Sequence, residues 1–287
     1  MASKSDEGLS AFAAVCLFAL TFALMVGIRL AFSAVAAALR DLSIAEGQRL
    51  VSGNLPALTL VQLLAMATVI VLGLKLSDPD APLAEALSLQ PARNLTLVLC
   101  LVAGACLQLP LAELANLLHH HVFGVEPLEQ QLARQALIEA HSPLGGAIVV
   151  VCLVALIPAA EELLFRGLFL FHLARRYGRG FALLFSACLF GLIHLGAVPS
   201  VFAAVAGLLL GTLALWTRSV WPGVALHAAV NAVPVLLPES LWPIHGFNVP
   251  SEQAEHLPPA LVLGALALTC CLLLWVRHLE ATRATHD

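Results

Sequence analysis

The sequence predicts an all-α protein, a polytopic bundle of about eight transmembrane helices. Of its 287 residues, 60% are hydrophobic and 11% are charged, whereas soluble domains carry about 25% charged residues. The mean hydropathy is +0.94, and the hydrophobic residues lie in long runs separated by short loops. This composition excludes a soluble globular enzyme, and the same apolar excess excludes a disordered chain.

The apolar runs that could cross a bilayer follow one another along the whole chain. In order they are Ala11 to Leu39, Leu55 to Leu76, Leu95 to Leu118, Leu144 to His172, Gly180 to Val198, Val201 to Thr217, Val220 to Leu237 and Leu257 to Val276. We therefore interpret residues 1–287 as a single integral membrane domain. A signal peptide is an alternative for the first run, because Lys4 precedes the run and the small residues from Ser33 to Ala36 resemble a cleavage site. The length of the run favours a membrane span.

The basic residues of the loops predict the orientation of the chain. If all eight runs cross the bilayer, nine Lys and Arg residues lie on the side of both termini and three lie on the other side. Cytoplasmic loops are enriched in Lys and Arg, so we expect both termini in the cytoplasm. The high Ala and Leu content and the short loops fit a bacterial inner membrane. The nine are Lys4, Lys75, Arg93, Arg175, Arg176, Arg179, Arg218, Arg277 and Arg283, and the three are Arg40, Arg49 and Arg134.

The charge of the chain indicates which partners it can bind, and its cysteine content indicates whether it forms disulfides. The net charge is -4 and the chain has no long basic run, which argues against nucleic acid, because that partner requires clustered Lys and Arg. The seven cysteines all lie within apolar runs, and their odd number suggests no disulfide framework. The lipid bilayer is thus the first partner that the sequence predicts.

The stretch between the third and fourth runs carries two polar features. Gln130 to Ala140 is spaced as an amphipathic helix, which we expect to lie along the outer membrane surface. His119, His120 and His121 could suggest a metal site. Consecutive residues of a helix point in different directions, so an interfacial loop is the preferred interpretation of these three histidines.

Polar and ionisable residues cluster inside three of the runs. A charged residue at bilayer depth is costly and is a candidate functional residue for that reason. The clustered residues are Glu161, Glu162 and Arg166 in the fourth run, Phe190 and His194 in the fifth, and His227 and Asn231 in the seventh. Polar contacts that only fix helix packing are the simpler explanation for a lone histidine, but a set on three helices favours function.

Spacing assigns directions to these side chains. Glu162 and Arg166 stand four residues apart, so they share a helix face and can form an ion pair. Glu161 is rotated by about 100° from Glu162 and is free to face a cavity. His227 and Asn231 also share a face, and Phe190 shares one with His194, whose ring it could orient.

These groups together suit peptide hydrolysis. A carboxylate beside an imidazole can take a proton from an attacking water, and a second imidazole with an amide N–H can stabilise the oxyanion. A serine mechanism through Ser186 is less well served, because no Gly-x-Ser-x-Gly elbow is present. Two Glu and two His could hold zinc, but no His-Glu-x-x-His motif occurs and Glu162 is engaged by Arg166.

The three motifs Glu161-Glu162-x-x-x-Arg166, Phe190-x-x-x-His194 and His227-x-x-x-Asn231 resemble the signature of the CAAX-protease and bacteriocin-processing family of intramembrane proteases. This family includes the Ras-converting enzyme. The resemblance covers residues 157–234, a motif-bearing protease core, and implies an eight-helix membrane endopeptidase.

Within that family pattern, the residue at Glu161 activates water together with His194. His227 and Asn231 hold the oxyanion, and Glu162, Arg166 and Phe190 support the site. Members of the family are described both as metalloproteases and as metal-independent glutamic proteases. The spacing favours the glutamic type without a cofactor, with a divalent metal such as zinc as the alternative.

The expected substrate is a membrane-associated protein or peptide, cut in CAAX-type, other C-terminal or leader processing. Two other classes stay open. A non-catalytic binding or immunity protein could keep the same fold and cluster, and a proton-coupled transporter would also need intramembrane Glu and His, although its repeated halves are not visible here. Along straight helices, Glu161 and His227 fall toward the cytoplasmic half and His194 toward the outer half, so the site requires a kink or a tilt to assemble.

Overall fold

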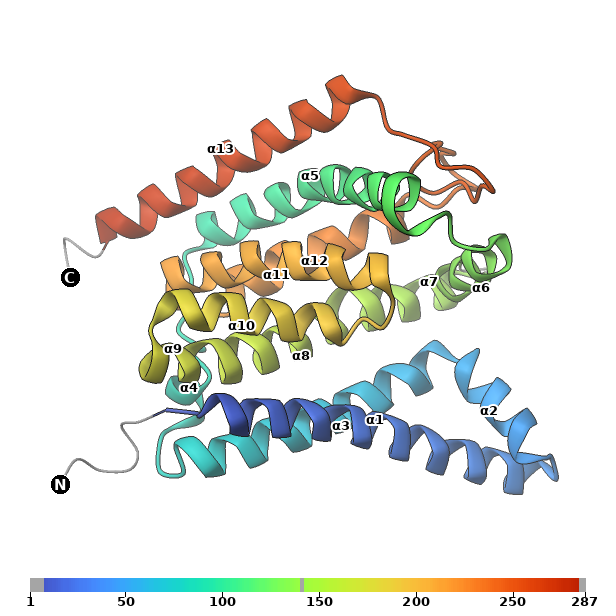
Figure 1. Cartoon of the computed structure of the whole chain (residues 1–287), viewed down its shortest axis with the longest axis horizontal. Helices are drawn as coiled ribbons and strands as arrows, with labels where there is room; N and C mark the ends of the chain where they lie inside the picture. The colour runs from blue at the N-terminus through green and yellow to red at the C-terminus, as the bar shows by residue number, and fades with distance from the viewer. Residues whose placement is uncertain (1–7, 140–141, 284–287) are drawn as a thin grey trace.

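The computed structural model of the chain describes residues 8–139 and 142–283, and every regular element within these two ranges is helical. Figure 1 shows helices running roughly side by side along the long axis of the molecule. Lys4, which enters the orientation argument, and Ala140, the predicted end of the amphipathic helix, lie outside the described residues.

Within residues 8–139 and 142–283, six helical segments are long and apolar enough to cross a membrane. They are α1 (Ala11–Arg40), α3 (Leu55–Ser77), α5 (Asn94–Leu118) with the π-helical turn that follows it, the segment Pro143–Tyr177, α11 (Ala197–Thr217) and α13 (Pro259–Arg283). Two shorter apolar helices, α10 (Arg179–Leu192) and α12 (Trp221–Leu236), complete the set. The protein is therefore a polytopic integral membrane protein, and each predicted run has its helix.

The observed bounds of α10 and α11 correct the predicted lengths of the fifth and sixth runs. Helix α10 ends at Leu192 instead of Val198, and α11 begins at Ala197 instead of Val201. Leu195 has φ 43° and Gly196 has φ 135°, a left-handed backbone that an α-helix cannot contain. At 14 residues, α10 is only about 21 Å long, less than a hydrocarbon core of about 30 Å.

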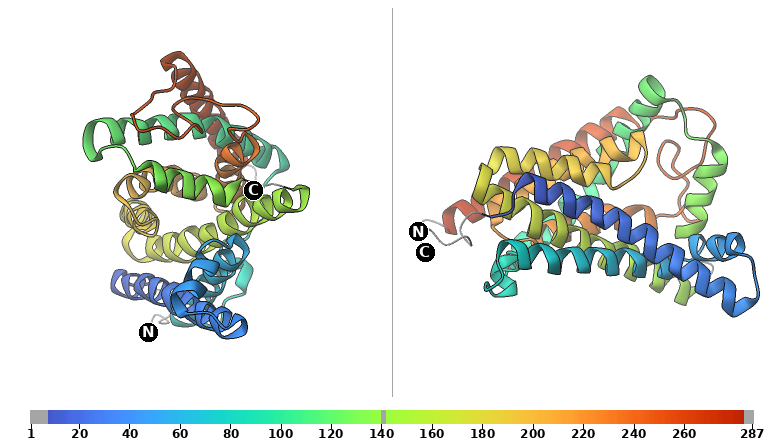
Figure 2. Two further views of the ribbon diagram at one scale, coloured as in Figure 1. Left: turned by 90° about the vertical axis from the view of Figure 1, so that its right-hand side faces the viewer. Right: turned by 60° about the horizontal axis from the view of Figure 1, so that its bottom comes forward.

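The helices are arranged in layers (Figures 1 and 2). Helices α1 and α3 pair at one side of the bundle, and α5 packs between α12 and α13 at the opposite side. The segment Pro143–Tyr177 lies in the middle, in contact with α3, α10 and α12. The start of α1 and the end of α13 lie at the same end of the molecule (Figure 2).

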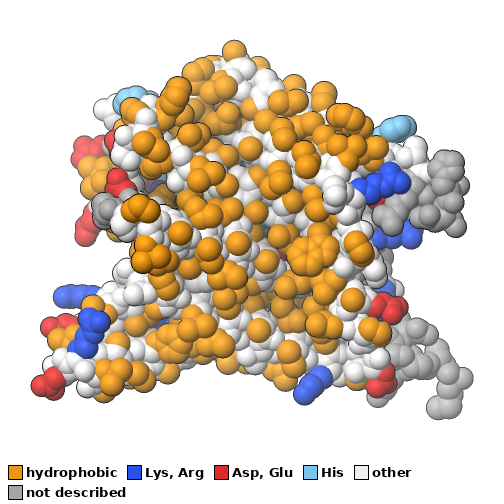
Figure 3. All heavy atoms as spheres, turned by 180° about the vertical axis from the view of Figure 1, so that it is seen from behind, with side chains coloured by type: hydrophobic (Ala, Val, Ile, Leu, Met, Phe, Trp, Pro, Cys, Tyr) orange, Lys and Arg blue, Asp and Glu red, His pale blue; other side chains and the backbone are white. Residues whose placement is uncertain are grey.

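The surface agrees with a bilayer environment. In Figure 3, hydrophobic side chains cover the middle of the face that is shown, and charged side chains gather toward its two edges. Large apolar side chains such as Phe12, Val98 and Leu184 are more than 45% exposed on the isolated chain, as expected for groups that contact lipid.

Short helices lie between the long ones. Helix α2 (Ile44–Ser52) begins with a capping box of Ser43 and Glu46, and hydrogen bonds from Ser43 hold the pKa of the Glu46 carboxyl below its usual range. Arg29, a cation within the apolar part of α1, donates to the Ser52 hydroxyl at 2.6 Å. It thus reaches the short helix beyond the membrane-spanning part of α1, as expected for a snorkelling cation.

The stretch between α5 and the fourth segment contains both features that the sequence indicates. Helix α6 (Leu128–Ile138) occupies the predicted amphipathic stretch. His119 to Phe123 form a π-helical turn, in which His119 bonds to the Gly124 carbonyl and His120 to the His256 ring. The histidines thus bond to neighbouring parts of the chain at a helix end.

Candidate active site

The fourth segment alternates between two kinds of helix. It runs from α7 (Pro143–Val149) through a π-helical stretch (Val150–Leu156) to α8 (Ile157–Glu162), and then through a second π-helical stretch (Leu163–Leu170) to α9 (Phe171–Tyr177). The glutamate pair closes the short α8 and is flanked by π-helix on both sides. Irregular helix of this kind is often found at functional sites.

Pro158 explains a contact that joins two of the motif-bearing helices. The amide of Ile157 donates to the Cys152 carbonyl, five residues earlier, and in this register residue 158 would donate to Leu153. Proline has no N–H group, so the Leu153 carbonyl accepts instead from the side-chain amide of Asn231 at 3.0 Å. The proline thus frees the carbonyl that holds α12 against the fourth segment.

Glu162 and Arg166 form the expected ion pair. Arg166 Nη1 lies 2.7 Å from Glu162 Oε1, and both side chains are fully buried. Arg166 also donates from Nη2 to the Gly207 carbonyl at 3.1 Å, and its guanidinium lies 4.3 Å from the centre of the Phe190 ring. These contacts tie the second π-helical stretch to α10 and α11.

Gly223 leaves the space that the Glu162 carboxylate occupies. A Cβ atom at Gly223 would lie 2.8 Å from Glu162 Oε2. Within the described residues, that oxygen and the Arg166 Nε atom are buried without a hydrogen-bond partner. The buried charges are therefore paired but incompletely hydrogen-bonded, which is a costly arrangement in the interior of a protein.

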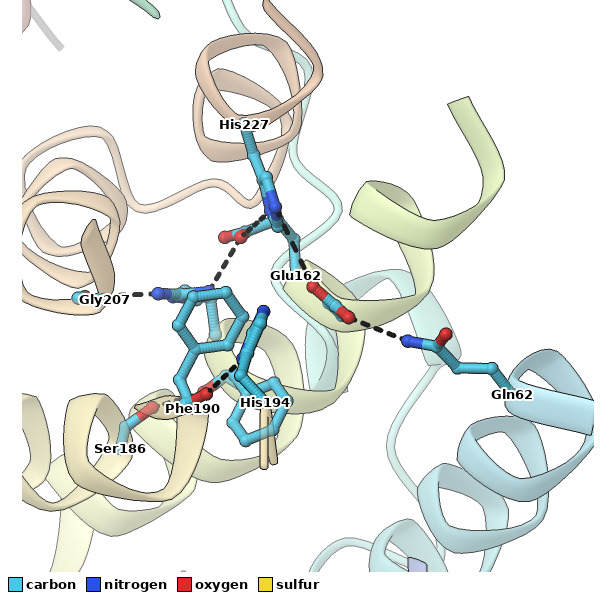
Figure 4. A network of polar contacts seen from close by, with 10 residues as sticks. Gln62, Glu162, Ser186, Phe190, His194, Gly207 and His227 are labelled. Carbon is cyan, nitrogen blue, oxygen red and sulfur yellow. Dashed lines mark hydrogen bonds and ion pairs between the residues drawn. The ribbon is translucent and has the colours of Figure 1, made fainter. Parts of the chain in front are cut away.

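His227 contacts both glutamates, and Figure 4 shows it beside Glu162. Its Nδ1 atom is 3.0 Å from Glu162 Oε1, and its Nε2 atom is 3.8 Å from Glu161 Oε2. The first contact assigns the Nδ1 proton, because a carboxylate oxygen can only accept. We call Glu161, Glu162, Arg166 and His227 the buried network.

Glu161 has a partner on a helix that carries none of the motifs. Its Oε1 atom accepts from the side-chain amide of Gln62, on α3, at 2.7 Å (Figure 4). The Glu161 side chain is only 5% exposed. The two adjacent glutamates therefore face different partners, a cation for Glu162 and a neutral amide for Glu161.

A cavity of about 110 Å³ is lined by at least one polar residue from each of the three motifs. Glu161, His194, His227 and Asn231 line it, and its other lining residues are apolar. The depth problem raised by the sequence is resolved by helix lengths: His194 lies in the turn beyond α10, about as far from the Gly178 turn as Glu161 lies before it. The short α10 thus ends at the depth of the glutamate pair.

His194 is positioned by the helix that it follows. Its Nδ1 atom lies 2.8 Å from the Phe190 carbonyl, so this nitrogen donates and Nε2 is left for other contacts. The Phe190 ring packs edge-on against both histidine rings, 5.0 Å from His194 and 5.7 Å from His227, measured between ring centres. Phe190 therefore contacts both imidazoles and the guanidinium of Arg166.

The structure also bears on the other two mechanisms considered. Ser186 is buried and donates to the Phe165 carbonyl at 2.9 Å, so its hydroxyl is engaged away from any base (Figure 4). Among the residues that the structure describes, no three His, Cys, Asp or Glu side chains form a group that could hold a metal ion. We derive no step through a metal.

Two site residues escaped the sequence analysis. Gln62 could have been predicted as a site residue, because it is a polar side chain inside the mostly apolar run of α3, and intramembrane polar residues are candidates by default. Gly223 gave no signal, because only the packed structure shows that its missing Cβ makes room for Glu162.

Comparison with known proteins agrees with the three motifs. Residues 143–233 match the family model described as Rce1-like, type II CAAX prenyl endopeptidase Rce1-like. No curated protein and no solved structure matches the chain. The matched segment contains every residue of the three motifs. Residues 143–233 are therefore similar to the Rce1-like family of type II CAAX prenyl endopeptidases, the same family that the three motifs resemble.

Proposed function

We propose that the protein is an intramembrane endopeptidase of the glutamic type that hydrolyses a peptide bond of a membrane-associated protein or peptide. The observation that carries this proposal is the shared cavity, where one carboxylate, two imidazoles and one amide from three helices meet. The match of residues 143–233 to the endopeptidase family model supports the class of reaction, and the geometry supports the roles of the individual residues.

The first step is attack by water on the scissile carbonyl. A water in the cavity is held by Glu161 and by His194 Nε2, and the Glu161 carboxylate takes one of its protons as the C–O bond forms. The tetrahedral oxyanion accepts hydrogen bonds from the imidazolium of His227, at Nε2, and from the N–H of Asn231 that Leu153 does not use.

The second step breaks the C–N bond. The protonated Glu161 returns its proton to the departing amide nitrogen, and the products are a carboxylic acid and an amine. His227 can donate to the oxyanion from Nε2 only in its doubly protonated form, because its Nδ1–H is engaged by Glu162.

We further propose that residues 1–287 form one membrane domain around the core at 157–234, with both termini in the cytoplasm. Two observations support this proposal. The start of α1 and the end of α13 lie at one end of the bundle (Figure 2), and most loop Lys and Arg residues belong to the side of the termini. On this proposal, a protease-sensitive tag at either terminus is cut only in inside-out membrane vesicles. Cleavage in right-side-out vesicles would contradict the orientation.

The central experiment compares new protein termini in native membranes that hold equal amounts of the wild-type chain or Glu161→Gln. We expect a set of termini that depends on Glu161 and that reappears when purified protein is reconstituted with the candidate substrate. The cleavage sequences then distinguish CAAX-type processing from other C-terminal or leader processing. Equal termini, under conditions where the biological effect of the chain persists, would favour the binding or immunity role.

Single variants test the roles. His194→Ala and His227→Ala should each abolish cleavage while the protein still inserts and accumulates, because each removes a group that contacts the reacting atoms. Normal hydrolysis by all three variants, Glu161→Gln included, would refute the assignment. Activity that survives exhaustive chelation supports the glutamic type, and loss that zinc restores would establish the metalloprotease alternative.

A further inference from the structure

We propose that Gln62 is a positioning residue for Glu161: its amide keeps the carboxylate ionised and turned toward the cavity. This inference rests on the proposed role of Glu161 as the base. It brings α3, a helix outside the segment that matches the family model, into the active site.

The contact with Gln62 restricts the orientation of the Glu161 carboxylate. Gln62 Nε2 lies 2.7 Å from Glu161 Oε1, while the other oxygen, Oε2, is the one nearest to His227 Nε2. A carboxylate held at one oxygen cannot rotate freely, so the second oxygen keeps its direction. Figure 4 shows the Gln62 side chain extending from its helix toward this carboxylate.

The two neighbouring glutamates have different partners. Glu162 is paired with the guanidinium of Arg166, which occupies its Oε1 atom. Gln62 gives Glu161 a strong hydrogen bond without a full positive charge. The carboxylate is thus kept ionised in an apolar setting and can still accept and return a proton during the reaction.

On α3, the Gln62 amide needs a hydrogen-bond partner. The helix is apolar along most of its length, and a glutamine amide inside a membrane span carries a cost unless it is hydrogen-bonded. The segment Pro143–Tyr177 packs directly against α3. The amide–carboxylate contact therefore also fixes the side-by-side position of these two spans.

The substitution Gln62→Leu removes the donor at similar volume, and Gln62→Glu replaces it by an acceptor of the same shape. Thr68→Val is the matched control, because Thr68 is a polar residue of α3 that is exposed on the chain and donates only to its own helix, at Leu64. Each variant is purified at full length and reconstituted in liposomes beside the wild type and Glu161→Gln.

The first measurement needs no substrate. In a pH titration followed by infrared absorption, the carbonyl band of a protonated carboxyl group that is missing in Glu161→Gln belongs to Glu161. We expect this band to appear at a higher pH in Gln62→Leu than in the wild type, and higher again in Gln62→Glu, because the ionised form loses its donor. Thr68→Val should match the wild type. An unchanged band in Gln62→Leu would overturn the proposal.

The second measurement is the kinetics of the cleavage found in the termini comparison. Gln62→Leu should lower kcat by about tenfold to a hundredfold, with KM within about twofold, and should move the acid limb of the pH–rate profile to higher pH. A residue that only packs would not move that limb. If the wild type cleaves and Gln62→Leu has an unchanged profile, the Gln62 proposal alone is wrong. If no Glu161-dependent cleavage occurs, the proposed function is wrong, and the infrared titration still decides whether Gln62 keeps Glu161 ionised.

Discussion

The network of Glu and His side chains inside the bundle differs from a second one, which lies at a helix end. In the second, Glu113 accepts from His256 at 2.7 Å, from the Leu257 amide at 2.9 Å and from Asn116 at 3.2 Å, and His256 contacts His120. We call Glu113, Asn116, His120 and His256 the loop network. It joins the end of α5 to the loop before α13.

Both networks contain Glu and His side chains, but they differ in how deeply these are buried and in how many of their polar atoms are hydrogen-bonded. In the loop network the His256 side chain is 36% exposed, and both Glu113 oxygens have donors. In the buried network Glu162 is fully buried, and its Oε2 atom lacks a partner among the described residues. Residue type alone therefore does not mark a site. The buried network is set apart by its burial, by a carboxylate oxygen without a partner among the described residues, and by the cavity that Glu161 and His227 line.

The two networks should differ most in the stability that is lost when each loses its cation or imidazole. Arg166→Met keeps the length of the side chain but leaves Glu162 without its counter-ion in the core. We expect a loss of about 3–5 kcal/mol of stability, seen as poor accumulation and a lowered Tm in detergent. A variant as stable as the wild type would mean that the buried charges are not both present in the folded protein.

Pro158→Ala tests the helix irregularity that assembles the site. Alanine restores an N–H that can bond to the Leu153 carbonyl in competition with Asn231. We expect the protein to stay folded while cleavage falls by about tenfold to a hundredfold, because Asn231 and α12 shift away from the cavity. The matched control is Pro199→Ala, in the exposed first turn of α11. Equal losses in both variants would point to a general effect of proline removal.

The buried network shows how far sequence reasoning reaches. The spacing of Glu162 and Arg166 predicts their ion pair, because two residues four apart share a helix face, and the pair is present at 2.7 Å. The helix face alone could not predict Gln62 as the partner of Glu161, because that contact joins residues 99 positions apart and depends on how α3 packs. Hydrophobic pattern gives the spans, and tertiary packing chooses the contacts between them.

The depth of the site was hidden for a related reason. Composition extends the fifth run to Val198, because Leu192 to Val198 is mostly apolar. The helix ends at Leu192 since Leu195 and Gly196 adopt positive φ angles, which hydropathy does not report. This early end places His194 in a turn at the level of Glu161, where it lines the same cavity.

His256→Ala should have a smaller effect than Arg166→Met. It removes one hydrogen bond to the Glu113 carboxylate, which keeps its bonds to Leu257 and Asn116 and can recruit water. We expect a loss of about 1 kcal/mol of stability, faster hydrogen exchange at the Leu257 amide and unchanged cleavage. A loss of cleavage equal to that of His227→Ala would show that the loop network takes part in the reaction and would remove the distinction drawn between the two networks.

The smallest effect is expected at an ion pair of the kind that membrane loops share with ordinary protein surfaces. Arg134 and Glu126 approach to 2.8 Å, but the Arg134 side chain is 61% exposed, so water screens the attraction. Arg134→Gln should change stability by no more than about 1 kcal/mol and should leave cleavage unaltered. Thermal unfolding in detergent at low and high salt measures this directly. A loss comparable to that of Arg166→Met would mean that α6 is held against the bundle by this pair, so that its burial in the membrane-embedded protein must be far greater than on the isolated chain.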